Sequence, residues 1–279
     1  MTTRVVDGVH VEVTTTGEGE PLVVIPGGPA RHPVYLEELG GLTGDGFGLI
    51  TLYPHGVGPS PAPDNVSGYA ASRLVDDLET LRSSLDLETL TLVAHSAGAA
   101  VALEYAACFP ERVGRLVLIT PATSVVGLRG TPDEEEAQLA LVAHEPWYAD
   151  ARRAADEIES DGVTPERRRA ILPLFYGVWD DAAREHASRD AEQANLEGRL
   201  HYFDDRPDPA VLGLELASVT CPVRILIGEL DPDPGPCVAG RLAALFPDAT
   251  VTTVPGSGHY PWVTVPEAFH TALVEALRG

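Results

Sequence analysis

The chain has 279 residues, of which 42 are acidic and 19 basic, so its formal net charge at pH 7 is −23. So acidic a surface repels phosphate backbones and anionic lipids, and we expect neither nucleic acid nor a membrane among its partners. All 19 basic residues are arginine, which excludes chemistry that needs a Schiff-base lysine or a phosphate-binding P-loop lysine.

The three cysteines, Cys108, Cys221 and Cys237, are few and widely spaced. They predict neither a zinc ribbon nor a disulfide framework, and they fit a reducing compartment.

The first residues carry no apolar signal region, and no apolar run reaches about 18 residues. We therefore expect a cytoplasmic protein.

The first half of the chain alternates short apolar runs with helical patterns. Val9, Val11 and Val13 alternate with polar residues and predict a half-buried antiparallel strand. The elements predicted after it are strands at residues 21–25 and 48–53, an amphipathic helix at 69–85, a strand at 89–94, a helix of small residues directly after it, and a strand at 115–119.

The strand pattern stops at about residue 121 and resumes after residue 217. Further strands are predicted at 222–228 and 249–254, and helices at 238–245 and 266–277. Buried strands that alternate with helices predict an α/β fold, with a mostly parallel sheet covered by helices on both faces. Residues 1–120 and 218–279 would form the core domain. Residues 121–217 would form a helical lid over the carboxyl ends of the strands, where such sheets bind ligands.

The sequence Ala94-His95-Ser96-Ala97-Gly98 lies between a predicted strand and a predicted helix. A sharp turn at this place strains its middle residue and requires small flanking residues, which Ala94 and Gly98 provide. The turn would raise the Ser96 hydroxyl above the sheet at the amino end of a helix. This context predicts a nucleophilic serine, with the N–H of Ala97 as one donor to an oxyanion.

A second oxyanion donor is predicted in the turn Pro26-Gly27-Gly28-Pro29, which follows a buried strand. Pro29 has no N–H, whereas Gly28 can donate a hydrogen bond, and its backbone can approach a substrate closely. We therefore assign this role to Gly28.

The base and its orienting acid are expected after the last two strands. Gly256-Ser257-Gly258-His259 is a loop that suits a catalytic histidine, whereas His95 is a poor base candidate because neighbouring elbow residues point apart. Glu229, Asp231 and Asp233 are the candidate acids, and the residues alone leave the choice among them open.

The sequence has no metal-ligand spacing and no dinucleotide-binding motif, so we expect no metal and no cofactor.

The order Ser96, Asp231, His259, with an elbow and a preceding glycine loop, resembles the α/β-hydrolase superfamily. The glycine loop, the segment His55-Gly56-Val57-Gly58 and the helical lid look most like the branch of proline iminopeptidases. The resemblance covers nearly the whole chain apart from the lid, and it implies the α/β-hydrolase fold and Asp231 as the triad acid. The chain departs from that branch's motifs at Pro26, Ala30, Tyr53, His55 and Ala94.

The predicted lid is rich in aromatic residues, some of which should face the strand ends and form a mostly apolar substrate pocket. The candidate pocket residues are Trp147, Phe175, Tyr176, Trp179, His201 and Tyr202. In the resembled peptidases, a carboxylate that holds the substrate's free amine stands just before the aromatic lid stretch. Arg199 and Leu200 occupy that place here, so we expect esters to be better substrates than prolyl amides.

These features together predict a serine hydrolase with a Ser96–His259–Asp231 triad. Its substrate would be an ester, thioester, lactone or amide of a moderately apolar small molecule, and the protein would be a monomer or homodimer. Three alternatives remain open: a proline iminopeptidase-like exopeptidase, a biosynthetic cyclase, lyase or acyl transferase, and a small-molecule receptor or binding protein that keeps the triad.

Overall fold

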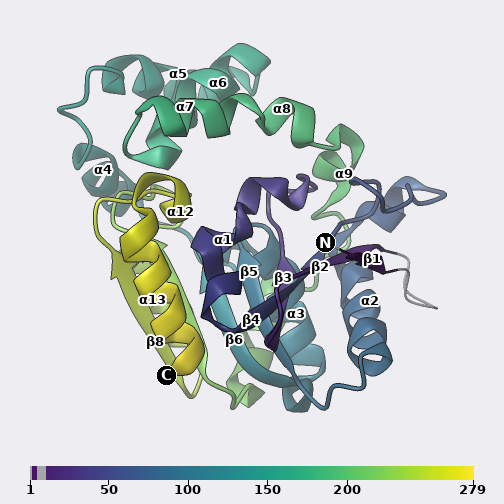
Figure 1. Ribbon diagram of the computed structural model, residues 1–279. Coiled ribbons are helices and arrows are strands. Elements are labelled where there is room, and N and C mark those ends of the chain that lie inside the picture. The colour runs from purple at the N-terminus through teal and green to yellow at the C-terminus, as the bar shows by residue number, and fades with distance from the viewer. Residues whose placement is uncertain (1, 5–10) are drawn as a thin grey trace.

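The computed structural model describes residues 2–4 and 11–279, and its centre is a single sheet (Figure 1). The strands of this sheet are β1 (Thr2–Arg4), β2 (Val13–Thr16), β3 (Glu20–Ile25), β4 (Phe47–Leu52), β5 (Leu90–His95), β6 (Val113–Ile119), β7 (Val223–Gly228) and β8 (Ala249–Val254). The helices are α1 (Glu38–Gly41), α2 (Ala71–Ser84), α3 (Gly98–Cys108), α4 (Pro132–Ala140), α5 (Tyr148–Asp161), α6 (Pro165–Tyr176), α7 (Asp181–Ser188), α8 (Asp190–Gln193), α9 (Leu196–His201), α10 (Pro209–Glu215), α11 (Pro236–Ala243), α12 (Pro261–Thr264) and α13 (Pro266–Arg278).

The strand order is β1-β2-β4-β3-β5-β6-β7-β8, and from β4 to β8 all neighbours run parallel. β1 and β2 form the antiparallel edge, with Val13 beside Leu52 of β4. Of the three valines that predicted this edge, Val13 begins β2 and Val11 is buried just before it, while Val9 lies outside the described residues.

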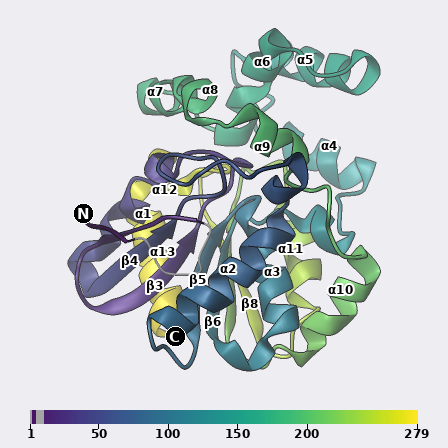
Figure 2. The ribbon, with the colours of Figure 1, turned by 90° about the vertical axis from the view of Figure 1, so that its right-hand side faces the viewer.

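Helices cover both faces of the sheet, as predicted, because successive strand residues bury apolar side chains on opposite sides. Val23 and Ile25 of β3 belong to the core beneath α2, α3, α10 and α11. Leu22 and Val24 belong to the core beneath α1, α12 and α13. Figure 2 shows these two helical layers on either side of the strands.

The segment between β6 and β7 is helical, and Figures 1 and 2 show α5–α9 beyond one end of the sheet. Both ends of this segment pack instead into the core beneath α2 and α3, which is called the main core below. Val125 and Val126 belong to the core beneath α2 and α3, as do Leu212 of α10 and Leu216 just after it. Residues 121–217 therefore include segments that belong to the core as well as the helices that extend away from it.

Candidate active site

The carboxyl ends of β3 and β5 lie side by side where the strand order reverses. The chain proceeds outward from β3 to β4 on one side and from β5 to β6 on the other, and Ile25 is paired with Ala94. Open α/β sheets bind their ligands in the crevice at such a point. The loop with Gly27 and Gly28 follows β3 there, and Ser96 follows β5.

Ser96 occupies a tight turn between β5 and α3. Its φ is 50°, a left-handed conformation that is strained for a residue with a side chain. A Cβ at Gly98 would lie 2.6 Å from the carbonyl oxygen of Ile25, so only glycine fits there. Ala94 has room for its methyl group, which is fully buried in the main core. The strand-to-helix turn that the sequence predicted is thus present, with alanine accommodated at its first position.

The glycine loop after β3 lies directly against this turn. A Cβ at Gly27 would lie 2.6 Å from the carbonyl oxygen of His95 and 3.1 Å from the backbone nitrogen of Ala97. Gly28 has a φ of 119°, which favours glycine. Within the described residues, the N–H groups of Gly28 and Ala97 donate to no protein acceptor. Both are therefore free to donate to a negatively charged oxygen beside Ser96.

His259 lies between Ser96 and Asp231 and contacts both. Its Nε2 is 2.8 Å from Ser96 Oγ, and its Nδ1 is 2.8 Å from Asp231 Oδ2. Asp231 follows β7 and is fully buried, whereas His259 follows β8 and is 7% exposed. The structure thus brings together the three residues that the sequence placed at the ends of three different strands.

The other two candidate acids do not hydrogen-bond to the imidazole. Glu229 accepts the backbone N–H of Gly256 at 2.8 Å and so supports the histidine loop. The backbone N–H of Asp233 donates to Asp231 Oδ1 at 3.1 Å and helps to orient that carboxylate. Of the three acids, only Asp231 therefore has the geometry to fix the tautomer of His259.

The charge of Asp231 determines the basicity of His259. Burial opposes formation of the imidazolium, but the adjacent Asp231 carboxylate outweighs this effect and raises the pKa of His259. A base with a raised pKa takes a proton from a serine hydroxyl more readily.

A buried polar network lies beneath His259, and the sequence did not indicate it. The Nε2–H of His95 donates to the backbone carbonyl of His259 at 3.1 Å, and His95 Nδ1 accepts the Tyr35 hydroxyl at 2.7 Å. The Tyr35 hydroxyl accepts the N–H of Gly27 at 2.7 Å. Burial lowers the pKa of His95 well below its usual value, so it stays neutral, as this pattern requires. His95 therefore ties the glycine loop to the histidine loop, and it does not contact Ser96 Oγ as a base.

A cavity of about 230 Å³ opens above Ser96 and His259. Its wall is formed mainly by apolar side chains of α5 and α6 and by Tyr260, together with Arg31, Arg168 and Asp190. Phe175 and Tyr176, two of the six predicted pocket residues, line this cavity. The three charged residues were not predicted, because they are far apart in the sequence and belong to no local motif.

The other four predicted pocket residues do not line this cavity. Trp147 packs beside α5 and Leu174, and Tyr202 is buried in the main core. His201 faces Asp204, with its Nδ1 2.6 Å from the carboxylate. Trp179 packs against the ring of Tyr176 and lines an adjoining cavity. Aromatic content alone could not show which side of each helix faces the strand ends.

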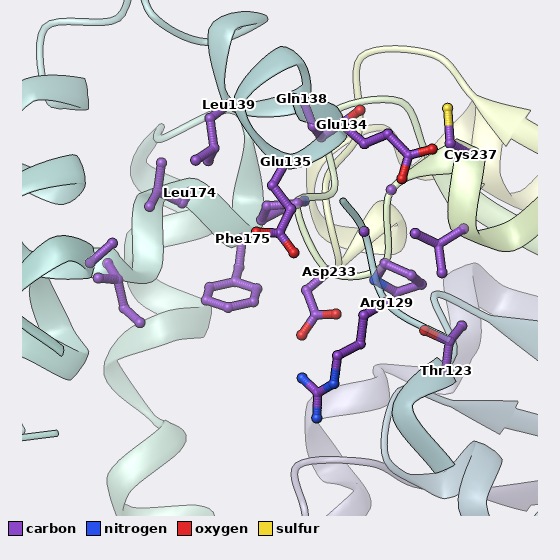
Figure 3. Close-up of a pocket in the computed structure, with 17 residues that line it drawn as sticks. Thr123, Arg129, Glu134, Glu135, Gln138, Leu139, Leu174, Phe175, Asp233 and Cys237 are labelled. Carbon is purple, nitrogen blue, oxygen red and sulfur yellow. The ribbon is translucent and has the colours of Figure 1, made fainter. Parts of the chain in front are cut away.

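A second cavity of about 290 Å³ shares Phe175 and Ile171 with the first but does not include Ser96. Figure 3 shows Phe175 in its wall, with the side chains of Glu135, Asp233 and Arg129 directed into the space beside it. Because Ser96 and His259 lie outside this larger cavity, the smaller one is the candidate substrate site.

The end of α6 lies directly on the histidine loop. The N–H of His259 donates to the carbonyl oxygen of Phe175 at 2.6 Å, and a Cβ at Gly258 would lie 2.3 Å from that oxygen. We expect Gly258→Ala to displace His259 or α6 and to lower kcat/KM by about tenfold to a hundredfold, as misplacement of catalytic groups does. Steady-state kinetics and thermal unfolding would measure this.

Gly240→Ala is the matched control, because a Cβ at Gly240 in α11 meets no atom within 4 Å. It should leave activity unchanged and stabilise the helix slightly. Wild-type activity in the Gly258→Ala variant would contradict the close contact between α6 and the histidine loop.

Among the described residues, no group of three or more His, Cys, Asp and Glu residues is arranged to hold a metal ion. None of the helices in that part of the chain has the length and apolarity needed to cross a bilayer.

Comparisons with known proteins agree with this architecture. A family model described as alpha/beta hydrolase fold matches residues 20–264. A curated relative, cis-3-alkyl-4-alkyloxetan-2-one decarboxylase from Shewanella oneidensis, is 35% identical over 138 residues, which are 48% of this chain and 41% of that protein. The match thus spans less than half of that relative's length.

Solved structures match over nearly their whole length. An esterase from Exiguobacterium antarcticum has a TM-score of 0.73 at 19% identity, covering 98% of this chain and 97% of that one. A proline iminopeptidase from Mycobacterium smegmatis has a TM-score of 0.74 at 20% identity, covering 99% and 96%. At these identities the likeness concerns the fold, and the branch of proline iminopeptidases is one of several that share it.

Proposed function

Because the chain belongs to the alpha/beta hydrolase fold family, we propose that it is a serine hydrolase whose nucleophile is Ser96. His259 is the general base and then the general acid, and Asp231 orients it. The substrate is an ester, thioester, lactone or amide of a small molecule with a moderately apolar part. The observation that carries this proposal is the hydrogen-bonded chain from Ser96 Oγ through His259 to the buried carboxylate of Asp231.

The geometry supports a two-step acyl transfer. Ser96 Oγ attacks the substrate carbonyl carbon while its proton moves to His259 Nε2, and the N–H groups of Gly28 and Ala97 stabilise the oxyanion. The intermediate collapses, and the leaving group departs with the proton from His259. Water, deprotonated by the same imidazole, then attacks the acyl-serine and releases the acid and free Ser96.

In this proposal the helices above the strand ends, within residues 121–217, act as a lid. Phe175 and Tyr176 line the cavity above Ser96, and the carbonyl of Phe175 accepts the N–H of His259. The lid therefore both shapes the substrate cavity and holds the histidine loop.

One charged contact disfavours the exopeptidase alternative. Asp190 is the only carboxylate in the described wall of the Ser96 cavity, and both of its oxygens are 3.1 Å from the guanidinium of Arg199. A substrate amine at this place would meet arginines and no available carboxylate. Lyase chemistry is the second candidate, because one relative, which the chain matches over 41% of its length, is named a decarboxylase.

A panel of 4-nitrophenyl esters from acetate to decanoate, assayed beside prolyl 4-nitroanilide, tests the proposed activity. Each methylene buried in the apolar part of the cavity contributes about 0.8 kcal/mol, so kcat/KM should rise with acyl length until the cavity is full and then fall. Prolyl anilide should be a poor substrate.

The alternatives predict different results from the same panel. Fastest turnover of prolyl anilide, with no dependence on ester length, would favour an exopeptidase. Thermal stabilisation by ligands without any ester turnover would favour a binding protein.

A further inference from the structure

The walls around Ser96 have a charge opposite to that of the whole chain. A larger cavity of about 600 Å³ adjoins the Ser96 cavity and shares Arg168, Asp190 and three apolar residues with it. The described walls of the two cavities contain one acidic residue and five arginines: Arg31, Arg168, Arg169, Arg184 and Arg199. Arg169 and Arg184 are exposed and pair with Glu166 and Asp181, so the local excess of positive charge comes from Arg31, Arg168 and Arg199. Acidic residues outnumber basic ones more than twofold in the whole sequence, so this reversal is local.

Three of these arginines share the single carboxylate of Asp190. Arg199 binds it with two N–O distances of 3.1 Å, Arg168 Nη2 lies 3.5 Å from Oδ2, and Arg31 Nη1 lies 3.7 Å from Oδ1. Burial opposes ionisation of Asp190, but the guanidiniums outweigh it and lower the pKa of this carboxyl. Asp190 is thus ionised, and one negative charge faces three positive ones.

Arg31 and Arg168 retain donors that the protein does not use. Arg31 is 1% exposed, and its Nε and Nη2 donate to Gln193 and to the carbonyl of His186. Within the described residues its Nη1 forms no hydrogen bond, and its closest carboxylate oxygen is the one 3.7 Å away. The Nε of Arg168 is buried and has no partner in that part of the chain. A carboxylate bound in the cavity would accept hydrogen bonds from these unused donors and balance the excess of guanidinium charge around Asp190.

Arg31 belongs to the same loop as the oxyanion donor Gly28. It lies three residues after Gly28, and its N–H donates to the carbonyl of Gly27 at 3.4 Å. Its guanidinium lies 4.4 Å from the centre of the Tyr35 ring, which fixes its position. Both Arg31 and Arg168 line the same cavity as Ser96 and His259.

We propose that the substrate hydrolysed at Ser96 carries a carboxylate, which Arg31 and Arg168 bind beside the scissile bond. This rests on the proposed function, since the anion belongs to the molecule that Ser96 attacks. The apolar wall holds the chain between the carboxylate and the reacting carbonyl, and the arginines select substrates with a negative end. The substrate class is therefore esters, thioesters, lactones or amides that also bear a free carboxylate.

Two matched pairs of esters test this proposal. The first pair places the charge on the acyl side: the mono-4-nitrophenyl ester of adipic acid against that of adipamic acid, its neutral amide. The second pair places it on the leaving group: 4-acetoxybenzoate against 4-acetoxybenzamide. In at least one pair, kcat/KM should favour the carboxylate by about tenfold or more, because a charge-assisted hydrogen bond is lost in the amide.

Arg168→Gln should lower the ratio of kcat/KM for the carboxylate to that for the amide to near one. Arg153→Gln is the matched control, because Arg153 lies on the exposed side of α5, pairs with Asp150 and lines neither cavity. Arg31 is fully buried and supports the glycine loop, so the test does not depend on its replacement.

A binding measurement separates this proposal from the proposed activity. Isothermal titration calorimetry with adipate and the Ser96→Ala protein should show saturable binding that Arg168→Gln weakens by about tenfold and Arg153→Gln leaves unchanged. Equal Ser96-dependent turnover of both members of each pair would overturn the carboxylate preference and leave the hydrolase proposal standing. Adipate binding without turnover of any ester would support the anion site and overturn the hydrolase proposal. Absence of both turnover and binding would overturn both.

Discussion

Replacement of Ser96 with alanine should lower kcat for a 4-nitrophenyl ester by about 10⁴- to 10⁶-fold, as removal of a triad serine does in serine hydrolases. The variant loses the atom that would form the proposed acyl intermediate, while His259, Asp231 and the N–H groups of Gly28 and Ala97 stay in place. Alanine keeps the Cβ of serine and adds no bulk, so the substitution does not increase the strain of the left-handed turn at this position, where φ is 50°. Single-turnover kinetics on purified protein would measure the effect, with circular dichroism to verify the fold.

Ser160→Ala is the appropriate control for this variant. Ser160 lies on α5 with its hydroxyl donating to a carbonyl of its own helix, and it should be replaceable without loss of activity. Loss of less than about a hundredfold in Ser96→Ala would mean that another group performs the nucleophilic step.

Asp231→Asn should lower kcat by about 10⁴-fold, because the amide stabilises the wrong tautomer of the histidine and provides no charge for the imidazolium. The carboxylate is also what raises the pKa of His259, and the neutral imidazole is the active form. Activity of the wild type should therefore fall as the pH drops through this raised pKa. In the variant, the residual activity should persist to a lower pH, and a pH profile of kcat/KM would show this shift of the acid limb.

Asp233→Asn provides the comparison for this prediction. Asp233 orients Asp231 through its backbone N–H, which the substitution leaves unchanged, so its side chain should contribute little to kcat. If Asp233→Asn caused the large loss and Asp231→Asn the small one, Asp233 would be the triad acid and the observed contact with His259 would not be the functional one.

The sequence predicted the fold and the arrangement of the triad because both depend on local signals. Apolar runs alternating with helical patterns define a parallel sheet, and residues just after such strands gather at one edge. Ser96 follows β5 directly, and Asp231 and His259 lie in the loops after β7 and β8, so their proximity could be expected. The choice of Asp231 over Glu229 and Asp233 came from the resemblance to the α/β-hydrolase superfamily and not from a local pattern. The glycine loop could be placed for the same reason, since it follows β3 beside β5.

The walls of the cavity depend on tertiary contacts that local patterns do not encode. Arg31, Arg168 and Asp190 come from the glycine loop, α6 and α8, and only the packing of the helices above the sheet brings them together. The positions of the aromatic residues also depend on tertiary packing that the sequence pattern does not encode. Tyr202 packs into the main core and His201 faces Asp204, although both were expected above Ser96. Likewise, His95 could be rejected as a base from the elbow pattern, but its contact with Tyr35 could not be foreseen.

Covalent labelling tests whether Ser96 is the single activated nucleophile of the protein. A fluorophosphonate should add one adduct to the intact protein, and peptide mapping should place it on Ser96, whose Oγ lies 2.8 Å from His259 Nε2. The Ser96→Ala protein should stay unlabelled under the same conditions. Labelling of a different serine, or labelling that persists in Ser96→Ala, would contradict the assignment of the nucleophile and with it the proposed hydrolase.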